Sequence, residues 1–153
     1  MTIRVAVTNQ KGGVGKTTTA VNLAASLTKA NRNVLLIDID PQGNASSAAG
    51  IKKNSESSLY EFFNSEEKIE SFIIEASGGY DIIPANNNLV AAEKIIEKTE
   101  NREKYFSAHL KKLPKKYDYI LIDCPPSLNL LTINSMEFCR NVLVPVQCEY
   151  YAL

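Results

Sequence analysis

The run Asn9-Gln10-Lys11-Gly12-Gly13-Val14-Gly15-Lys16-Thr17-Thr18 decides the fold of this chain. A segment of β-branched and small residues, 3–8, precedes the run and predicts a short buried strand. Apolar residues at helical spacing follow it and predict a helix with one apolar face, through Ala20, Leu23, Ala24 and Leu27. Glycines between a strand and a helix let backbone N–H groups approach an anion, which the positive end of the helix also attracts. The run therefore predicts a phosphate-binding loop.

The side chains of this loop indicate which groups of a nucleotide it would hold. Lys16 is placed to reach the β- and γ-phosphates, Thr17 to bind Mg²⁺ and Thr18 to donate to the α-phosphate. The stricter pattern GxxxxGK(S/T) is not met, because Gln10 stands at its first glycine, and Lys11 is an additional lysine. An ordinary glycine-rich turn is the alternative, but the strand before and the helix after favour a phosphate site. The expected nucleotide-binding residues are Lys11, Gly12, Gly13, Val14, Gly15, Lys16, Thr17 and Thr18.

Length and composition limit the class of protein. The 153 residues, 44% hydrophobic and 22% charged, suit one soluble globular domain. Seventeen basic residues balance seventeen acidic ones, so no net field favours nucleic acid or anionic lipid. No stretch approaches the roughly 20 apolar residues of a membrane span, and residues 1–5 lack the features of a signal peptide. The cysteines lack CxxC spacing and are expected to be buried, reduced thiols in a cytoplasmic protein: Cys124, Cys139 and Cys148.

The rest of the chain alternates strand and helix patterns. Apolar runs of the kind found in parallel sheets predict strands over residues 33–39, 80–84, 117–122 and 142–146. Helical patterns cover residues 58–63, 88–113 and 127–138. Ser58 and Glu61 have the spacing of a capping box, a break is expected near residues 99–101, and Ser127 can cap the last helix. We therefore expect an α/β P-loop NTPase fold over residues 1–153, one domain with a mostly parallel sheet and helices on both faces.

Three aspartates follow predicted strands. Asp123 comes directly after an apolar run, and Asp38 and Asp40 stand at the end of the second strand. The carboxyl ends of parallel strands lie at one edge of a sheet, beside the phosphate loop. Each acid alone is as readily explained as a cap or turn residue. Together with the loop, they predict carboxylates that hold a metal and orient an attacking water.

Three motifs together resemble one known family. They are the phosphate loop, the run Asp38-Ile39-Asp40-Pro41-Gln42-Gly43-Asn44 and the run Asp123-Cys124-Pro125-Pro126-Ser127. In this order they resemble the deviant Walker ATPases of the ParA/Soj family, which partition chromosomes and plasmids. The closing run, residues 144–153, is similar to that family as well, so the resemblance covers the whole chain.

The resemblance implies a role for each matching residue. Lys11 would be the family's hallmark lysine, which reaches the partner subunit's phosphates in an ATP-sandwiched homodimer. Lys16 would hold the phosphates and Thr17 the magnesium of Mg·ATP. Asp40 would position the hydrolytic water, while Asp38 and Asp123 would support the metal and its waters. Catalysis would therefore depend on Lys11, Lys16 and Asp40.

The resemblance also implies partners and a longer protein. In the family, the dimer of the full-length protein binds DNA without sequence preference, on the nucleoid, and a ParB-type protein stimulates ATP hydrolysis. Family members continue beyond the position of Leu153. We therefore expect this chain to be the amino-terminal part of the ATPase domain, without most adenine contacts and the DNA-binding basic residues.

Other functions remain as alternatives. The chain could be a non-catalytic nucleotide-binding or dimerisation module. MinD-type division-site ATPases share the loop but not the run from Asp38 to Asn44, and cluster-binding relatives place cysteines in Cys-Gly-Gly settings that are absent here. His109 is expected to pack on a helical face. A small basic run is interpreted as a solvated helix end, with contact to DNA phosphates as the alternative: Lys111, Lys112, Lys115 and Lys116.

Overall fold

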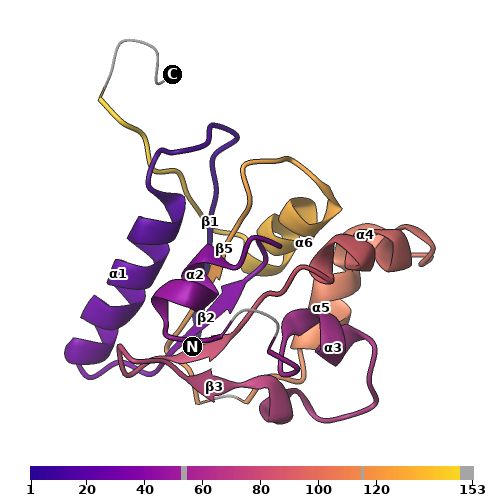
Figure 1. Ribbon diagram of the computed structural model, residues 1–153, viewed down its shortest axis with the longest axis horizontal. Coiled ribbons are helices and arrows are strands. Elements are labelled where there is room, and N and C mark those ends of the chain that lie inside the picture. Colours follow the sequence, from indigo (N-terminus) through magenta and orange to yellow (C-terminus); the bar gives the residue numbers. More distant parts are fainter. Residues whose placement is uncertain (53–54, 115, 149–153) are drawn as a thin grey trace.

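A computed structural model describes residues 1–52, 55–114 and 116–148 of the chain, and its centre is one six-stranded sheet with the order β3-β4-β2-β5-β1-β6 (Figure 1). The strands are β1 (Ile3–Val7), β2 (Val34–Asp38), β3 (Ile74–Glu75), β4 (Asp81–Ile83), β5 (Tyr119–Asp123) and β6 (Val142–Leu143). All neighbouring pairs are parallel except β3 and β4, which are antiparallel. The helices are α1 (Lys16–Lys29), α2 (Asn44–Ala48), α3 (Leu59–Phe63), α4 (Leu89–Glu97), α5 (Tyr105–Leu110) and α6 (Leu130–Cys139), with 3₁₀ turns η1 (Ile69–Phe72) and η2 (Arg102–Lys104).

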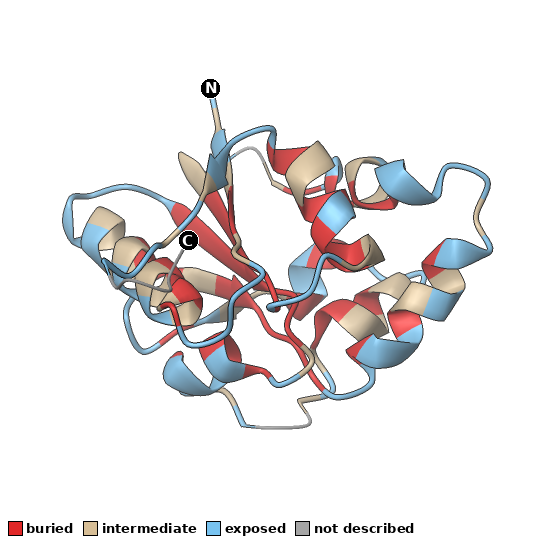
Figure 2. Cartoon of the chain, turned by 90° about the horizontal axis from the view of Figure 1, so that it is seen from above, coloured by how far each residue is buried: buried red, intermediate tan, exposed pale blue. Residues whose placement is uncertain are grey.

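The sheet separates two apolar clusters, and the fully buried strand β2 contributes to both. Leu35 and Ile37 pack in a cluster with residues of α3, α4, α5 and α6. Val34 and Leu36, on the opposite side of the strand, pack with residues of α1 and α2. Figure 2 shows the buried residues gathered along the strands and on the sides of the helices that face them. The predicted mostly parallel sheet with helices on both faces is confirmed.

Most predicted elements are present. The structure differs from the prediction at the end of the last strand and at the beginning of the last helix. The predicted helix over residues 88–113 is broken into α4 and α5, as expected. The last strand is shorter than predicted, because β6 ends at Leu143 rather than at Val146. Pro145 has no N–H to continue the ladder, and its carbonyl accepts instead from Asn9 Nδ2 at 2.9 Å.

The prediction that Ser127 caps the last helix is wrong. Helix α6 begins at Leu130, and its cap is Asn129, whose Oδ1 accepts from Thr132 N at 3.0 Å. Ser127 lies in the loop before the cap, where its carbonyl accepts from the Thr132 hydroxyl at 2.8 Å. Both residue types are good caps, so the choice depends on how far the chain runs after the two prolines before it turns into a helix.

The Ser58 capping box is also not formed as predicted. Ser58 does precede α3, but its hydroxyl donates to the Glu61 carboxylate rather than accepting from a backbone N–H. The Glu61 carboxylate is drawn towards Asn86 as well, whose Nδ2 donates to it at 3.0 Å. This longer-range contact competes with the local capping pattern.

Three further expectations concern individual side chains and the chain as a whole. Cys124 and Cys139 are buried free thiols, but Cys148 is exposed, contrary to expectation, because it lies beyond the last strand. His109 stacks on Tyr105 with ring centroids 3.9 Å apart, which confirms a packed histidine. Within the described ranges, no helix is both long and apolar enough to cross a membrane. Lys115 and the end of the closing run, residues 149–153, lie outside the described residues.

Candidate nucleotide-phosphate site

A polar cleft lies at the carboxyl edge of the parallel strands, where the loops after β1, β2 and β5 meet. Figure 1 shows the loops after β1 and β5 at the same end of the sheet. The cleft has a volume of about 460 Å³ and is lined by Gly12, Gly13, Gly15, Lys16, Thr17, Thr18, Asp40, Gln42, Asn44 and Pro126. Six of the eight predicted loop residues and Asp40 thus lie together, and the structure adds Gln42, Asn44 and Pro126. Lys11 and Val14 do not line the cleft, and Val14 is buried.

The phosphate loop requires glycine for its backbone conformation. Gly13 has a φ of 72° and Gly15, directly before α1, a φ of 90°. Residues with a side chain rarely adopt these φ values, whereas glycine does so without steric cost. No atom lies within 4 Å of the positions where Cβ atoms of Gly12, Gly13 and Gly15 would stand, so the face of the loop is open to an approaching anion.

The two lysines of the loop lie in different environments. Lys16 is buried, with 7% of its surface exposed, and its Nζ donates to the Lys11 carbonyl at 2.9 Å. Its ammonium group is therefore folded over the loop, where phosphate oxygens would meet it. Lys11 is exposed at the entrance, and its backbone N–H donates to Asn9 Oδ1 at 3.0 Å. Lys16 lines the cleft, whereas Lys11 is not among the residues that line it.

The closing segment holds the phosphate loop from a second side. Asn9 Nδ2 donates to the Pro145 carbonyl at 2.9 Å, and Gln147 Nε2 donates to the Gly13 carbonyl at 3.0 Å. More than 130 positions separate the members of each pair. The sequence therefore indicates these residues only through the family resemblance. These two contacts use the Asn9 side chain and the Gly13 carbonyl, and none of the backbone N–H groups of the loop.

Asp123 is the buried acid next to the loop. Its Oδ2 accepts from the Thr17 hydroxyl at 2.7 Å, and its Oδ1 is buried with no hydrogen-bond partner among the described residues. Burial, and then the charge of Asp38, raises the pKa of Asp123 to about 7. An unpartnered carboxylate oxygen beside a threonine hydroxyl is a fitting donor set for Mg²⁺, which takes one or two protein oxygens together with phosphate and water. No larger cluster of acids, histidines and cysteines suited to a metal occurs in the described part of the chain.

Asp38 and Asp40 occupy two depths at the end of β2. Asp40 lines the cleft, and its Oδ1 accepts from Gln42 N at 2.9 Å. Asp38 is completely buried behind it; its Oδ1 accepts from Asp40 N at 3.0 Å and its Oδ2 from the Ser46 hydroxyl at 2.7 Å. Burial raises the pKa of Asp38 to about 6, although these hydrogen bonds oppose the shift.

Comparison with known protein families matches residues 2–153 to the family described as AAA domain. The chain belongs to this family. It is 49% identical to the sporulation initiation inhibitor protein Soj of Bacillus subtilis over 152 residues, which is 97% of this chain and 60% of that protein. It is 48% identical to the chromosome partitioning protein ParA of Myxococcus xanthus over 151 residues, 97% of this chain and 53% of that protein. The resemblance to ParA and Soj proteins is confirmed, and the chain spans little more than half the length of these relatives.

Solved structures agree with this AAA domain assignment. A plasmid partition protein from Borrelia burgdorferi matches with a TM-score of 0.85 and 32% identity over 99% of this chain and 67% of that one. Cobyrinic acid a,c-diamide synthase from Mycobacterium smegmatis, with bound ADP and magnesium, matches with a TM-score of 0.94 and 38% identity. That match covers 100% of this chain and 63% of the synthase. Nucleotide and magnesium therefore occur together on this fold.

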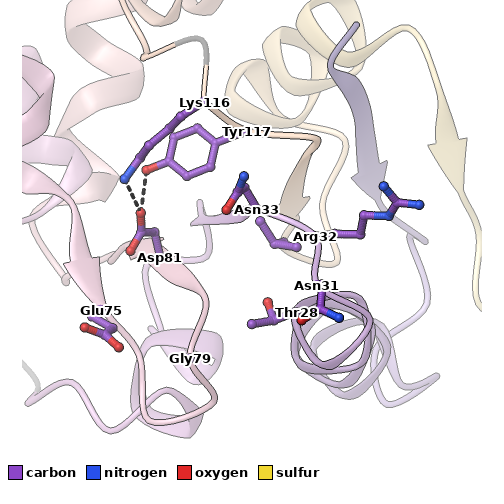
Figure 3. A pocket seen from close by; sticks show the side chains of 10 residues that line it. Thr28, Asn31, Arg32, Asn33, Glu75, Gly79, Asp81, Lys116 and Tyr117 are labelled. Carbon is purple, nitrogen blue, oxygen red and sulfur yellow. Dashed lines mark hydrogen bonds and ion pairs between the residues drawn. The ribbon is translucent and has the colours of Figure 1, made fainter.

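The AAA domain has another cleft at the opposite, amino-terminal edge of the sheet, with a volume of about 440 Å³ (Figure 3). Its acid Asp81 accepts from Lys116 Nζ at 2.9 Å and from the Tyr117 hydroxyl at 2.7 Å. Burial, and then the bond to Asp81, raises the pKa of Tyr117 above its usual value. Arg32 points away from this cluster in Figure 3. Asp81, Lys116 and Tyr117 are thus paired with one another, as in a structural contact, whereas the Thr28 hydroxyl of this cleft is buried without a hydrogen-bond partner among the described residues.

Proposed function

We propose that this AAA domain binds Mg·ATP in the phosphate cleft and hydrolyses it as a partition ATPase of the ParA/Soj type, in the segregation of chromosomes or plasmids. The observation that carries the proposal is the contact between Thr17 and Asp123, which leaves a buried carboxylate oxygen unpartnered beside a glycine loop. The similarity to chromosome and plasmid partition proteins supports the choice of biological process. The synthase structures with ADP or an ATP analogue and magnesium support the choice of ligand.

The residues of the cleft divide the chemistry among them. Backbone N–H groups of the loop and the ammonium of Lys16 bind the phosphates, and Thr18 reaches the α-phosphate. Magnesium, when bound, neutralises charge that develops on the phosphate oxygens. Thr17 and Asp123 support the metal beside the loop, and Asp38 supports it from behind Asp40. Asp40 orients the attacking water, because it is the carboxylate that lines the cleft.

Lys11 extends the proposal to a homodimer. Lys11 is exposed at the loop entrance, and the resemblance to the ParA/Soj family supports its contact with the phosphates bound by a second subunit. Lys11→Ala should leave ATP affinity within about twofold but abolish ATP-dependent dimerisation, measured by light scattering. An ATP-induced dimer of normal size in this variant would contradict the role. Non-specific DNA and a ParB-type stimulating protein are proposed as partners of the whole protein.

A non-catalytic nucleotide-binding module is the other candidate, because relatives are longer than this chain. The two candidates differ at Asp40. ATP hydrolysis that requires Mg²⁺ and is lost in Asp40→Ala would establish the enzyme. Tight Mg·ATP binding without turnover in wild type and variant alike would establish the module.

Calorimetric titration with Mg·ATP tests the site itself. Lys16→Ala should weaken binding by at least about 100-fold, since it removes the buried cation that meets the β- and γ-phosphates. Lys29→Ala, at the exposed end of the same helix, is the matched control and should bind like wild type. Equal affinities of folded wild type and Lys16→Ala would refute the phosphate site.

A further inference from the structure

Ser46 is a buried serine in the short helix α2, with 4% of its surface exposed. It does not line the phosphate cleft, yet it contacts the buried acid Asp38 behind it. Its backbone N–H and its hydroxyl both donate to Asp38 Oδ2, at 2.8 and 2.7 Å. Its Oγ also accepts from Ala85 N at 2.9 Å. One side chain thus joins the ends of β2 and β4.

The contact with Ala85 fixes the direction of the Ser46 hydroxyl. A backbone N–H can only donate, so Ser46 Oγ acts as acceptor towards Ala85 and its own hydrogen is left for Asp38. Asp38 then accepts from Asp40 N with its other oxygen, at 3.0 Å. The result is a connected series of hydrogen bonds in which Ala85 donates to Ser46, and Asp38 accepts from Ser46 with one oxygen and from the Asp40 backbone with the other.

This series ends on a tight turn that sets the Asp40 side chain. Gly43 N donates to the Asp40 carbonyl at 2.8 Å, and Gln42 N donates to Asp40 Oδ1 at 2.9 Å. Gly43 has a φ of 62°, and a Cβ at this position would stand 3.4 Å from the Ala85 carbonyl. The turn is therefore held against the segment after β4 by the same residue, Ala85, that orients Ser46.

We propose that Ser46 is a positioning residue for ATP hydrolysis, which holds the Asp38–Asp40 turn so that the Asp40 carboxylate faces the water beside the bound phosphates. The inference rests on the proposed function of the cleft, where Asp40 orients that water. Ser46 has no contact with the cleft, so its effect passes through Asp38 and the Asp40 backbone. Displacement of a catalytic group by about 1 Å can lower a rate by about 100-fold, while phosphate binding by the separate glycine loop is unaffected.

The test is steady-state ATP hydrolysis by the 153-residue chain and three variants. Ser46→Ala should lower kcat by about 10-fold to 100-fold and leave the KM for ATP within about twofold. Ser46→Thr keeps the hydroxyl and should recover most of kcat. Ser47→Ala changes the exposed neighbour in the same helix and should match wild type. A Ser46→Ala protein with wild-type kcat, or with an equal loss of kcat in Ser47→Ala, would overturn the proposal.

Amide hydrogen exchange on the same proteins separates this proposal from the proposed function. In Ser46→Ala the amides of Asp40 and Ala85 should exchange at least about 10-fold faster, while amides of β5 stay protected. Ala85 loses its acceptor, and Asp38, the acceptor of the Asp40 amide, loses the Ser46 hydroxyl that holds it. If wild type binds Mg·ATP without turnover, the proposed hydrolysis fails, and unchanged exchange at Asp40 in Ser46→Ala would then overturn the positioning role as well. Faster exchange confined to Asp40 and Ala85 would support the positioning geometry even in that case.

Discussion

The two edges of the central sheet carry clefts of nearly equal volume, about 460 Å³ at the carboxyl edge and about 440 Å³ at the amino edge. Their acids differ in what they contact. At the amino edge, Asp81 is paired with Lys116 and Tyr117. At the carboxyl edge, Asp123 is completely buried and has one oxygen without a hydrogen-bond partner in the part of the chain that the structure describes. The amino edge has an unpartnered buried hydroxyl as well, on Thr28, but an unpartnered carboxylate oxygen costs more free energy and indicates a ligand more clearly than the size of a cleft does.

The edges also differ in how the backbone is used. Gly13, Gly15 and Gly43, at the carboxyl edge, have positive φ values. At the amino edge positive φ values fall on Gly79 and also on Asn31 and Arg140, and the last two accept some steric cost. At the carboxyl edge, these positive φ values thus fall on glycines, where the chain must stay open to a ligand. The amino edge tolerates residues with side chains at positive φ in its turns.

The largest expected effect is a loss of ATP hydrolysis, and it distinguishes the two aspartates at the two ends of β5. Asp123→Asn retains an acceptor for Thr17 but removes the charge, so Mg²⁺-dependent ATP hydrolysis should fall by at least about 100-fold. Asp118 lies just before the same strand, and its carboxylate accepts from Asn33 N at 2.8 Å. Asp118→Asn should keep hydrolysis within about twofold. Phosphate release measured over a range of Mg²⁺ concentrations would show the difference. Similar rates in the two variants would remove the functional distinction between the edges.

The second effect is a dependence of stability on pH that originates at the carboxyl edge. Burial raises the pKa of Asp38 to about 6 and of Asp123 to about 7, from a usual value of 3.8. Between these pH values the folded chain keeps protons on the two carboxyls that the unfolded chain has released. Their contribution to the free energy of unfolding is complete below about pH 4 and is lost as the pH rises to about 7. Denaturant unfolding in a chelator without nucleotide should give a lower free energy of unfolding at about pH 8 than at about pH 5. Asp123→Asn should reduce this difference, and an unchanged difference would contradict the assignment.

The features that depend on short-range sequence were predictable. The glycine loop, the apolar strands and the acids at their ends each follow from a few adjacent residues, and the structure places the loop and Asp40 in one cleft. Parallel pairing explains why: Asp38 and Asp123 are direct partners in the register of β2 and β5. A strand pattern with an acid at its end therefore also predicts which acids become neighbours.

The features that depend on distant contacts could not be predicted in the same way. Ser46 is one of several small polar residues in its run, and its partner Ala85 is 39 positions away. Gln147 meets Gly13 across 134 positions. The cap of α6 was placed at Ser127 rather than Asn129 because both residue types suit a cap, and only the path of the chain from β5 decides between them.

A smaller effect is expected at the amino edge from Asp81→Ala. The variant leaves the buried Tyr117 hydroxyl without its acceptor, which should lower the free energy of unfolding by about 1–2 kcal/mol. The exposed ion pair with Lys116 adds little to this loss. Urea unfolding measures the change, and affinity for Mg·ATP should stay at the wild-type value. Weaker nucleotide binding by the folded variant would mean that the two edges are coupled.

The smallest effect is a gain in stability from Arg140→Gly, again at the amino edge. Arg140 follows α6 with a φ of 62°, and its N–H donates to the Met136 carbonyl at 2.9 Å. Glycine keeps this bond and removes the steric cost of about 1–2 kcal/mol, but it raises the entropy of the unfolded chain. The net gain should be about 0.5–1 kcal/mol in urea unfolding, with unchanged ATP hydrolysis.

Gly15→Ala is the counterpart at the carboxyl edge, where the φ of 90° should make alanine destabilising and weaken Mg·ATP binding. If Gly15→Ala bound Mg·ATP like wild type, the conformation of the loop would not be what prepares it for phosphate, and the contrast between the edges would rest on the buried acids alone.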